Sequence, residues 1–381
     1  MLRMKLKILE ICPFSAGACG VWQRVKQEST ELAKEGYEVR VFSSYFEKGT
    51  NKIMPPNEKV GRIEIQRFLA IKLGGESFMY FNFKKEALRY SPDIIIAHNY
   101  RHLHTTQALK VKKILEKQGK KCKIFLVTHA PFVENNTTRT KLQAAIVKIY
   151  DFFIGPLTLN KFDKIIAITH WEIPYLINVG EKKEKIVYIP NGIPEDFFKQ
   201  KKANPKKDKD VLFLGRISPI KNLEVLIEAA KLLPHINFSL VGPSEKNYLE
   251  KLNCLMAELK NIKIYPAIYD LKKKIKLIDE HKILVLPSKR EAMPQALIEA
   301  MARGKVVISS NTNGGKEIIK NRRNGFLFKI GNAKQLANLI KENINGNKNI
   351  KKQAEKEAKQ YSWDKLINIL NRLIINEYSN N

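Results

Sequence analysis

Residues 283–304 read ILVLPSKREAMPQALIEAMARG, and this stretch decides the class of fold. The apolar run 283–286 has the length of a buried strand, and a short loop follows it at 287–290. Pro294 is well placed to open a helix, because the first turn of a helix lacks amide partners and tolerates proline. Gly304 is placed to end that helix. A buried strand that leads directly into a helix is the repeating unit of a parallel α/β sheet.

The same alternation of strand-length apolar runs and helical patterns extends over almost the whole chain and predicts βαβ units throughout. The strands are expected at 7–12, 38–43, 93–97, 123–128, 164–169 and 186–189 in the first half, and at 210–214, 237–241, 263–265, 283–286 and 306–309 in the second. Between the halves, the segment 194–209 (PEDFFKQKKANPKKDK) is rich in charge and proline, as domain linkers are. A chain of 381 residues with this pattern is expected to form two α/β domains with a boundary near Asn204.

Composition and charge narrow the function classes. Apolar residues make up 44% of the chain and charged residues 28%, which is typical of a globular protein and argues against disorder. The formal net charge of +30 comes mostly from dispersed lysines, so a compositional bias of the whole surface explains it better than nucleic-acid binding. Because no recognisable nucleic-acid module accompanies the charge, no nucleic-acid partner is expected, whereas a membrane-surface role stays open.

Cysteine usage and hydropathy indicate the compartment. The four cysteines lack CxxC spacing, so we expect reduced thiols with neither a disulfide nor a zinc site. These cysteines are Cys12, Cys19, Cys122 and Cys254. No uninterrupted apolar run approaches the roughly 20 residues that span a bilayer, and the first residues lead straight into a strand pattern. We therefore expect a cytoplasmic protein, with peripheral contact to the cytoplasmic face of the membrane left open.

Two apolar helices are expected to pack on other surfaces. The stretch 142–159 (LQAAIVKIYDFFIGPLTL) is interrupted by charged residues and by Gly155-Pro156, which favours a core helix with a break over membrane insertion. Such a helix could still support a lipid-facing acceptor site. The stretch 362–376 is expected to dock through one helical face. That face carries Trp363, Leu366, Ile369, Leu370 and Leu373.

The opening stretch also holds two glutamates that point to a hydroxyl-rich ligand. Ligands of open α/β sheets lie outside the carboxyl ends of the strands, where Glu291 and the helix N-terminus would line a crevice. Glu291 and Glu299 are eight residues apart, so they could reach two parts of an elongated ligand such as a ribose diol and a hexose. On spacing alone, a Glu299 that merely faces solvent is slightly favoured.

A basic pair follows the first strand of the second half. Residues 213–222 read FLGRISPIKN, in which Gly215 permits close backbone approach and Arg216 and Lys221 could neutralise a diphosphate. The motif is short, and surface charge explains both cations equally well apart from their place at a strand's carboxyl end.

In the first half, a glycine loop and several histidines follow predicted strands. Gly17 and Gly20 precede a helix, but the full GxGxxG and the acidic residue of dinucleotide enzymes are missing, which disfavours a nicotinamide cofactor. A plain turn and a contact to donor phosphate through backbone N–H groups are about equally supported for this loop.

Histidines follow two of these strands, and a metal is the alternative to polar contact. His98 and His129 both lie at expected carboxyl ends, and His102 and His104 lie near His98. No carboxylate or thiolate support for a metal is evident from the sequence, so metal-free polar roles are expected, with His129 ahead of His98.

Taken in order, these motifs resemble a known family, the retaining glycosyltransferases of the GT-B fold in glycosyltransferase family 4. The resemblance covers nearly the whole chain. In the first half it is carried by the loop from Gly17 to Gly20, PDIIIAHN at 92–99, THA at 128–130, FDKIIAIT at 162–169 and IPNGI at 189–193. In the second half it is carried by GRISPIKN at 215–222, LVGP at 240–243, REAMPQALIEAMARG at 290–304, GG at 314–315, NGFLF at 324–328 and YSWDKL at 361–366.

The resemblance implies an α/β fold of the GT-B type, with two facing Rossmann-like domains built on parallel sheets. Residues 1–203 would form the acceptor domain and residues 204–360 the nucleotide-sugar donor domain. Residues 361–381 would form a C-terminal helix that packs back on the N-terminal domain. The implied activity is retaining, metal-independent transfer of a sugar from a nucleoside diphosphate sugar to a glycan, lipid-linked or small-molecule acceptor, without a further cofactor.

The resemblance also implies roles for particular residues. Arg216 and Lys221 would bind the donor diphosphate, Glu291 the transferred sugar, and His129 would contact that sugar; these four form the expected catalytic set. The remaining expected donor contacts are Gly20 to phosphate, Gly242 and Ile268 to the nucleobase, Glu299 to the ribose hydroxyls, and the backbone at Met293, Pro294 and Gln295 to the sugar.

Departures and alternatives limit what the resemblance specifies. The family often has an aspartate after IPNG, where this chain has Ile193-Pro194-Glu195, and often Gly-Phe after the first glutamate, where it has Ala292-Met293. The identity of the sugar therefore stays open. Two alternatives also stay open: a nucleotide-sugar epimerase of the same two-domain architecture, and a basic protein that binds nucleic acid or membrane surfaces.

Overall fold

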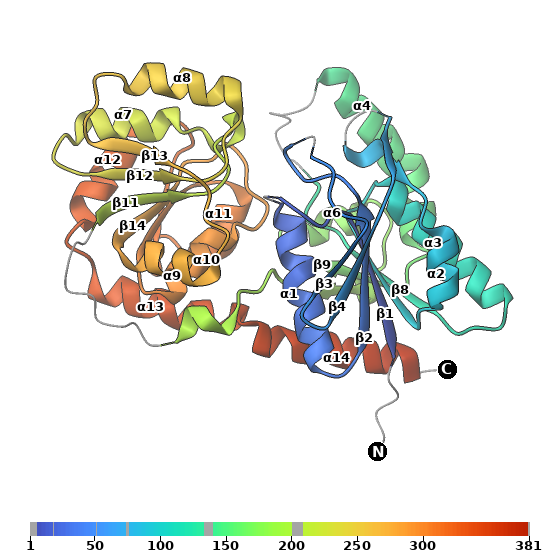
Figure 1. Ribbon diagram of the computed structural model, residues 1–381. Coiled ribbons are helices and arrows are strands. Elements are labelled where there is room, and N and C mark those ends of the chain that lie inside the picture. The colour runs from blue at the N-terminus through green and yellow to red at the C-terminus, as the bar shows by residue number, and fades with distance from the viewer. Residues whose placement is uncertain are drawn as a thin grey trace. The chain divides into compact units, whose positions relative to one another are not determined.

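A computed structural model describes residues 6–17, 19–50, 52–73, 76–132, 140–199 and 209–379. The chain divides into two compact units. Unit 1 combines Met1–Gly192 with Trp363–Asn381, and unit 2 is Ile193–Ser362. Each unit is an α/β structure with helices around its own sheet, as predicted (Figure 1). The expected boundary between residues 203 and 204 lies in the segment 200–208, outside the described residues.

Unit 1 is built on a sheet whose spatial order is β10-β9-β8-β7-β1-β2-β4-β3. The strands are β1 Lys7–Phe14, β2 Glu38–Ser44, β3 Asn57–Val60, β4 Ile63–Phe68, β7 Ile94–His98, β8 Lys123–Val127, β9 Lys164–Ala167 and β10 Ile186–Tyr188. All neighbours pair in parallel except β3 and β4, which are antiparallel. The central strands are buried on both faces, which is why they read as nearly continuous apolar runs. The predicted strands of the first half are confirmed, whereas β4 and the edge strand β3 were not predicted.

Helices and one small hairpin complete unit 1. The hairpin pairs β5 (Ala70–Lys72) with β6 (Met79–Phe81) in antiparallel orientation, and a 3-10 turn, η1 (Glu76–Phe78), precedes β6. The helices are α1 Gly20–Lys34, α2 Lys84–Tyr90, α3 Leu103–Lys117, α4 Lys141–Ile149, α5 Gly155–Leu159, α6 Ile173–Asn178 and α14 Trp363–Ser379, with a π-helix, η2 Tyr150–Ile154, between α4 and α5.

Unit 2 has a fully parallel sheet in the order β13-β12-β11-β14-β15-β16. Its strands are β11 Lys209–Leu214, β12 Phe238–Val241, β13 Ile262–Tyr265, β14 His281–Leu286, β15 Val306–Ser310 and β16 Phe326–Phe328. Its helices are α7 Glu224–Leu232, α8 Lys246–Met256, α9 Leu271–Asp279, α10 Gln295–Ala302, α11 Asn313–Ile318, α12 Ala333–Asn343 and α13 Lys348–Ala358. The five strands predicted for this half are confirmed, and β16 adds a sixth at one edge.

The last helix, α14, returns to unit 1 and lies beside α1 (Figure 1), as the resemblance implied. Trp363 is buried, and its indole Nε1 donates a hydrogen bond of 2.9 Å to Gln27 Oε1 on α1. A Cβ on Gly192 would lie 2.8 Å from the Trp363 ring, so this close approach requires glycine. The expected docking face needs one correction. Ile369 is 42% exposed, and Ile367 is buried instead.

The prediction of a core helix at 142–159 was wrong. Neither α4 nor η2 contains a buried residue, and in α5 only Gly155 and Leu159 are buried. Among the described residues, Lys141–Leu159 is the one helix long and apolar enough to cross a membrane, and 11% of its apolar window is buried. The physical reason for the error is that apolar periodicity shows that a helix has an apolar face, but not what covers that face.

Candidate functional site

The candidate site in unit 2 lies where β11 and β14 end, because these neighbouring parallel strands place their following loops side by side. The Lys289 amide donates to the Ile220 carbonyl at 2.9 Å, which joins the two loops. Lys221 ends the short turn after β11, and its Nζ donates to Glu291 Oε1 at 2.6 Å. The structure thus brings together two of the four residues expected to be catalytic.

The Lys221–Glu291 pair is only partly shielded from solvent. The lysine side chain is 19% exposed and the glutamate side chain 8%. Ser288 Oγ donates a second hydrogen bond of 2.6 Å to the same carboxylate oxygen. The pair therefore places a positive and a negative group next to each other at the strand ends, within reach of water and of a ligand.

Glycines let the backbone of unit 2 close up around these loops. The Gly314 amide donates to the Glu291 carbonyl at 3.1 Å, and a Cβ on Gly314 would lie 2.5 Å from the Ala292 carbonyl oxygen. Likewise, a Cβ on Gly242 would lie 1.9 Å from the Gly215 carbonyl oxygen. Glycine is needed at positions 314 and 242 for packing. Close packing alone is therefore enough to require glycine at position 242. Its expected role in nucleobase binding stays a prediction.

Helix α10 begins one residue later than predicted, at Gln295 rather than at Pro294. Pro294 occupies the N-cap position and Gln295 is the first helical residue, while Met293 is buried. Gly304 follows the helix with a φ of 61°, the left-handed conformation that ends many helices. The amino end of α10 carries a partial positive charge, and Ala292, Met293 and Pro294 connect it to Glu291.

Glu299 is buried, so the solvent-facing alternative is wrong. The residue is 2% exposed, its Oε1 accepts a bond from Lys274 Nζ, and its Oε2 has no hydrogen-bond partner in the described part of the chain. A buried carboxylate oxygen without a partner is costly. The free acceptor is thus consistent with the expected contact to a ribose hydroxyl.

Three further residues were predicted to contact the donor, namely Arg216, Ile268 and Gly20. Arg216 is half-exposed and forms a loose ion pair with Glu245, at 3.7 Å. Ile268 is half-buried in the loop after β13. Gly20 is the exposed first residue of α1, and no described atom lies within 4 Å of a Cβ built there. Packing therefore does not explain the glycine at position 20, which leaves its expected role untested.

Unit 1 contains a second group of polar residues, the His98 cluster, which consists of Glu10, Arg24, Glu28, His98 and His129. Strand register explains how Glu10 and His98 meet. Glu10 pairs with Ile96, so the two-residue period of a strand places Glu10 and His98 on one face of the sheet. His129 follows the end of β8, whose last residue, Val127, pairs with His98. Helix α1 supplies the other two from its buried face.

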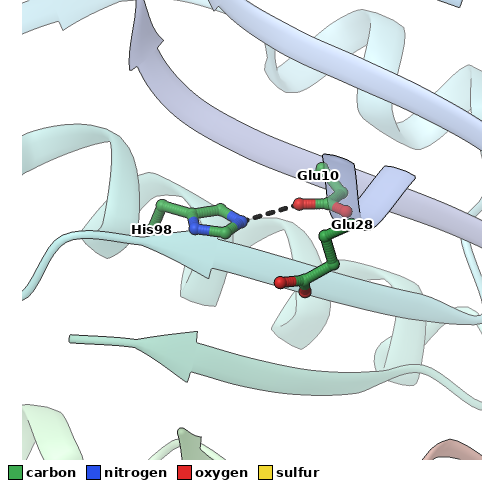
Figure 2. A group of neighbouring side chains, drawn as sticks. All are labelled: Glu10, Glu28 and His98. Carbon is green, nitrogen blue, oxygen red and sulfur yellow. Dashed lines mark hydrogen bonds and ion pairs between the residues drawn. The ribbon is translucent and has the colours of Figure 1, made fainter. Parts of the chain in front are cut away.

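Hydrogen bonds connect Glu10, His98 and His129 of the His98 cluster. Ser29 Oγ donates to Glu10 Oε1 at 3.0 Å, and Glu10 Oε2 lies 2.7 Å from His98 Nε2, as Figure 2 shows. His98 Nδ1 in turn lies 2.9 Å from His129 Nε2. His129 has a φ of 59°, an uncommon conformation for this residue type that often occurs at functional sites.

Burial keeps both partners of the central contact neutral. It raises the pKa of Glu10 to about 8 and lowers the pKa of His98 to about 3, because each charged form would lose its hydration. With Glu10 protonated and His98 neutral, the Glu10 hydroxyl would donate to His98 Nε2, and His98 Nδ1–H would donate to His129 Nε2. Burial also lowers the pKa of His129 well below its usual value. The cluster thus holds His129 as a neutral imidazole in a fixed orientation.

The carboxylate support that the sequence did not reveal is present. Ligand atoms of Glu10, Glu28 and His98 all lie within 4.8 Å of one another (Figure 2). Arg24 Nε lies 2.8 Å from Glu28 Oε2, with both side chains fully buried, so a guanidinium balances the charge of this glutamate. With Glu10 protonated, the described contacts account for the charges of the cluster. The prediction of a metal-independent protein stays a prediction.

Arg24 also holds the segment 189–191, near the point where the chain first leaves unit 1. Its Nη1 donates to the Ile189 and Pro190 carbonyls at 3.0 and 2.9 Å and to Asn191 Oδ1 at 3.3 Å. This bonding anchors the IPNG motif, which lies where the chain leaves unit 1. Sequence reasoning missed Arg24, although a charged residue between the apolar positions Trp22 and Val25 of a helix is a readable signal.

Comparison with known proteins covers both halves of the chain. The family model described as Glycosyltransferase Family 4 matches residues 18–197, and the model described as Glycosyl transferases group 1 matches residues 194–361. The chain belongs to glycosyltransferase family 4, with the GT-B fold. A solved structure, sucrose-phosphate synthase from Thermosynechococcus elongatus, superposes with a TM-score of 0.78 at 18% identity, and the match covers 99% of this chain and 100% of that one.

Two curated relatives of this glycosyltransferase chain have named activities. The N,N'-diacetylbacillosaminyl-diphospho-undecaprenol alpha-1,3-N-acetylgalactosaminyltransferase of Campylobacter jejuni is 30% identical over 189 residues, which is 49% of each chain. The UDP-Gal:alpha-D-GlcNAc-diphosphoundecaprenol alpha-1,3-galactosyltransferase of Escherichia coli is 31% identical over 182 residues, 41% of this chain and 44% of its own. The chain thus spans less than half the length of either relative.

Proposed function

We propose that the protein transfers a sugar from a nucleoside diphosphate sugar to a lipid-linked diphosphate acceptor, with UDP as the preferred nucleotide. The observation that carries this proposal is the Lys221–Glu291 contact at the strand ends before α10. In a glycosyl diphosphate, phosphate oxygens and sugar hydroxyls lie a few ångströms apart. An adjacent ammonium and carboxylate suit such a ligand, because one pairs with phosphate and the other accepts from hydroxyls.

The residues of unit 2 would act mainly on the leaving group. The bond between the anomeric carbon and the phosphate oxygen breaks, and the nucleoside diphosphate gains negative charge. The Lys221 ammonium and the amino end of α10 would stabilise that charge. The acceptor oxygen forms its bond on the face that the phosphate leaves, which retains the anomeric configuration, and its proton passes to the leaving phosphate or to water. Glu291 would orient the sugar during this exchange.

The proposed acceptor and nucleotide are inferred from the named activities of the two relatives. Both enzymes are named for transfer to an undecaprenyl diphosphate-linked sugar, and one is named for UDP-galactose as donor. The expected place of action, the cytoplasm or the cytoplasmic face of the membrane, is part of this proposal.

A thermal-shift panel of UDP-, GDP- and ADP-sugars tests the donor. We expect a UDP-sugar to raise the melting temperature, since a ligand that binds only the native state stabilises it. Lys221→Ala should abolish the shift, whereas Lys289→Ala, at an exposed lysine of the neighbouring loop, should leave it unchanged. A shift that Lys221→Ala retains would contradict the donor site.

Product analysis with a polyprenyl diphosphate-linked sugar tests the transfer. We expect release of nucleoside diphosphate that depends on the acceptor, together with a lipid product longer by one sugar. A free epimerised sugar, formed without acceptor-dependent nucleotide release, would show instead that the protein is an epimerase.

A further inference from the structure

The helix Lys141–Leu159, which crosses from β8 to β9, exposes a continuous apolar surface. Phe152 is 75% exposed and Leu142 71%. The other large apolar side chains exposed along it are Ile146, Ile149, Phe153, Ile154 and Leu157. Soluble proteins rarely leave such a run uncovered, so the surface requires an occupant.

Part of the exposed apolar set lies on one face of this helix. Leu142, Ile146, Ile149 and Phe153 are spaced four, three and four residues apart, which is the period of a single helical stripe. Ala144 and Val147 are half-buried on the side toward the rest of unit 1. Lys141 and Lys148 are exposed, and their spacing of seven residues puts both at the same edge of the apolar stripe.

Contacts with unit 1 fix the rotation of this helix. Arg101 Nε donates to Asp151 Oδ1 at 2.7 Å, and Tyr100 Oη donates to the same oxygen at 3.2 Å. A Cβ on Gly155 would lie 2.6 Å from both Tyr100 Oη and Val179 Cγ1, so the helix touches the body closely at this glycine. Because one side of the helix is bonded to folded protein, the helix cannot be surrounded by lipid, and a membrane would meet it from its apolar side.

The charges of the helix Lys141–Leu159 indicate what covers its apolar face. Asp151 is its only acidic residue, and Arg101 pairs with that carboxylate. Lys141 and Lys148 therefore give the surface a net positive charge, on a chain whose formal charge is +30. Lysine at the border of an apolar face with phenylalanine is typical of helices that lie in an anionic lipid interface. A protein partner fits less well, since lysine is depleted in protein interfaces.

We propose that Lys141–Leu159 is an interfacial helix through which the protein docks on an anionic phospholipid bilayer. The apolar stripe enters the acyl boundary in the membrane plane, and Lys141 and Lys148 contact lipid phosphates. This docking does not depend on the proposed transfer reaction, but it would bring unit 1 to a surface that contains lipid-linked acceptors.

Vesicle co-sedimentation of the full-length protein tests the proposal. We expect binding to vesicles of phosphatidylcholine with phosphatidylglycerol, weaker binding to phosphatidylcholine alone, and loss of the difference at high salt. Phe152→Ser with Phe153→Ser should weaken binding at least tenfold for each residue, because each removes a large buried apolar area from the bound state. Lys141→Gln with Lys148→Gln should weaken binding to anionic vesicles by roughly fivefold per lysine.

Matched variants control for apolar content and for charge. Lys334→Gln with Lys341→Gln removes two exposed lysines with the same spacing on α12, and Leu232→Ser with Tyr269→Ser removes two exposed large side chains of unit 2. Neither pair should change vesicle binding. Ile71→Ser with Phe78→Ser tests the exposed side chains of the β5–β6 hairpin, which should contribute less than the helix.

Three outcomes would overturn the proposal. The first is no binding of the native chain to anionic vesicles. The second is unchanged binding of the Phe152/Phe153 variant, or loss of binding only in the hairpin variant. The third is a dimer in solution that the Phe152/Phe153 variant dissociates, because the apolar face would then belong to a second copy. Thermal melting and the donor shift, measured on every variant, separate failure of docking from misfolding and from failure of the proposed donor site.

Discussion

The two units place polar groups at the same kind of position, but the central contact of each group differs in charge. The His98 cluster lies at the carboxyl ends of β7 and β8 and is buried, so the pKa values of Glu10 and His98 shift until both are neutral. The Lys221–Glu291 pair lies after β11 and β14 and keeps partial exposure. Burial therefore decides the role: one cluster orients a neutral imidazole, and the other presents a cation and an anion to a ligand.

The largest effect is expected from the buried ion pair of the His98 cluster. Arg24→Met leaves Glu28 charged and unpaired and removes the bonds to the IPNG segment, which should cost about 3–5 kcal/mol in the free energy of unfolding. Urea denaturation measures this loss. The matched control is Arg40→Met, whose partner Glu64 is exposed, and it should cost less than about 1 kcal/mol.

A double variant identifies the cause of that loss. If the uncompensated charge dominates, Arg24→Met with Glu28→Met should recover a large part of the stability, because an apolar pair can replace a buried ion pair. Equal losses of stability for Arg24→Met and Arg40→Met would contradict the idea that burial makes the Arg24–Glu28 pair more important than the exposed pair.

The next effect concerns rate rather than stability. Lys221→Ala should lower the rate of nucleoside diphosphate release about 10²–10³-fold, equivalent to about 2.7–4 kcal/mol of barrier, by analogy with other groups that stabilise a developing anion. Unfolding should change by about 1 kcal/mol or less, since the pair is partly solvated. Steady-state kinetics and melting curves measure the two quantities, with Lys289→Ala as the control. A loss of stability without a loss of rate would assign Lys221 a structural role.

A further prediction tests the protonated state of Glu10. Because its folded pKa of about 8 is above the ordinary value of 4.5, the folded protein binds an extra proton between these values. The stability that this proton gives is present below pH 4.5 and is lost as the pH rises toward and through about 8. Glu10→Gln mimics the protonated form and lacks this dependence. The native chain should therefore lose stability relative to Glu10→Gln as the pH rises from 5 to 9.

Melting temperatures of the native chain and Glu10→Gln over this pH range give the comparison directly. Taking the difference removes the contributions of the other buried groups, such as His104 and Glu172, which both proteins share. A difference that does not vary with pH would mean that Glu10 is ionised in the folded protein, and that the two clusters hold charge in the same way.

The strands and the family motifs could be predicted because each depends on local pattern. Buried parallel strands such as β1, β7 and β14 are apolar runs of fixed length, and turn glycines and prolines mark their ends. The sequence also predicted that Lys221 and Glu291 both follow strands, and neighbouring parallel strands bring the loops after them together. The edge strand β3 and its neighbour β4 were missed because a half-exposed, alternating sequence such as IEIQRF carries a weaker signal than a continuous apolar run.

The chemistry of the His98 cluster could not be predicted from local sequence patterns. Glu10 stands in an apolar strand and Arg24 on a helix, and nothing in their spacing shows that they meet near His98, 88 residues from Glu10. Only the order and register of the strands bring these residues to one face, and only burial then shifts their pKa values. The orphaned oxygen of Glu299 belongs to the same class, because a carboxylate on a helix looks alike in sequence whether it is buried or exposed.

For this protein, the sequence by itself determined the two α/β units, the order of the motifs and, through them, the family. These follow from propensity and periodicity, which act over a few residues. The tertiary structure decided which side chains share a site, which carboxyls are protonated, and that the apolar face of Lys141–Leu159 is left open rather than buried. These properties depend on what packs against a residue from distant parts of the chain, and burial is not encoded in any short stretch of sequence.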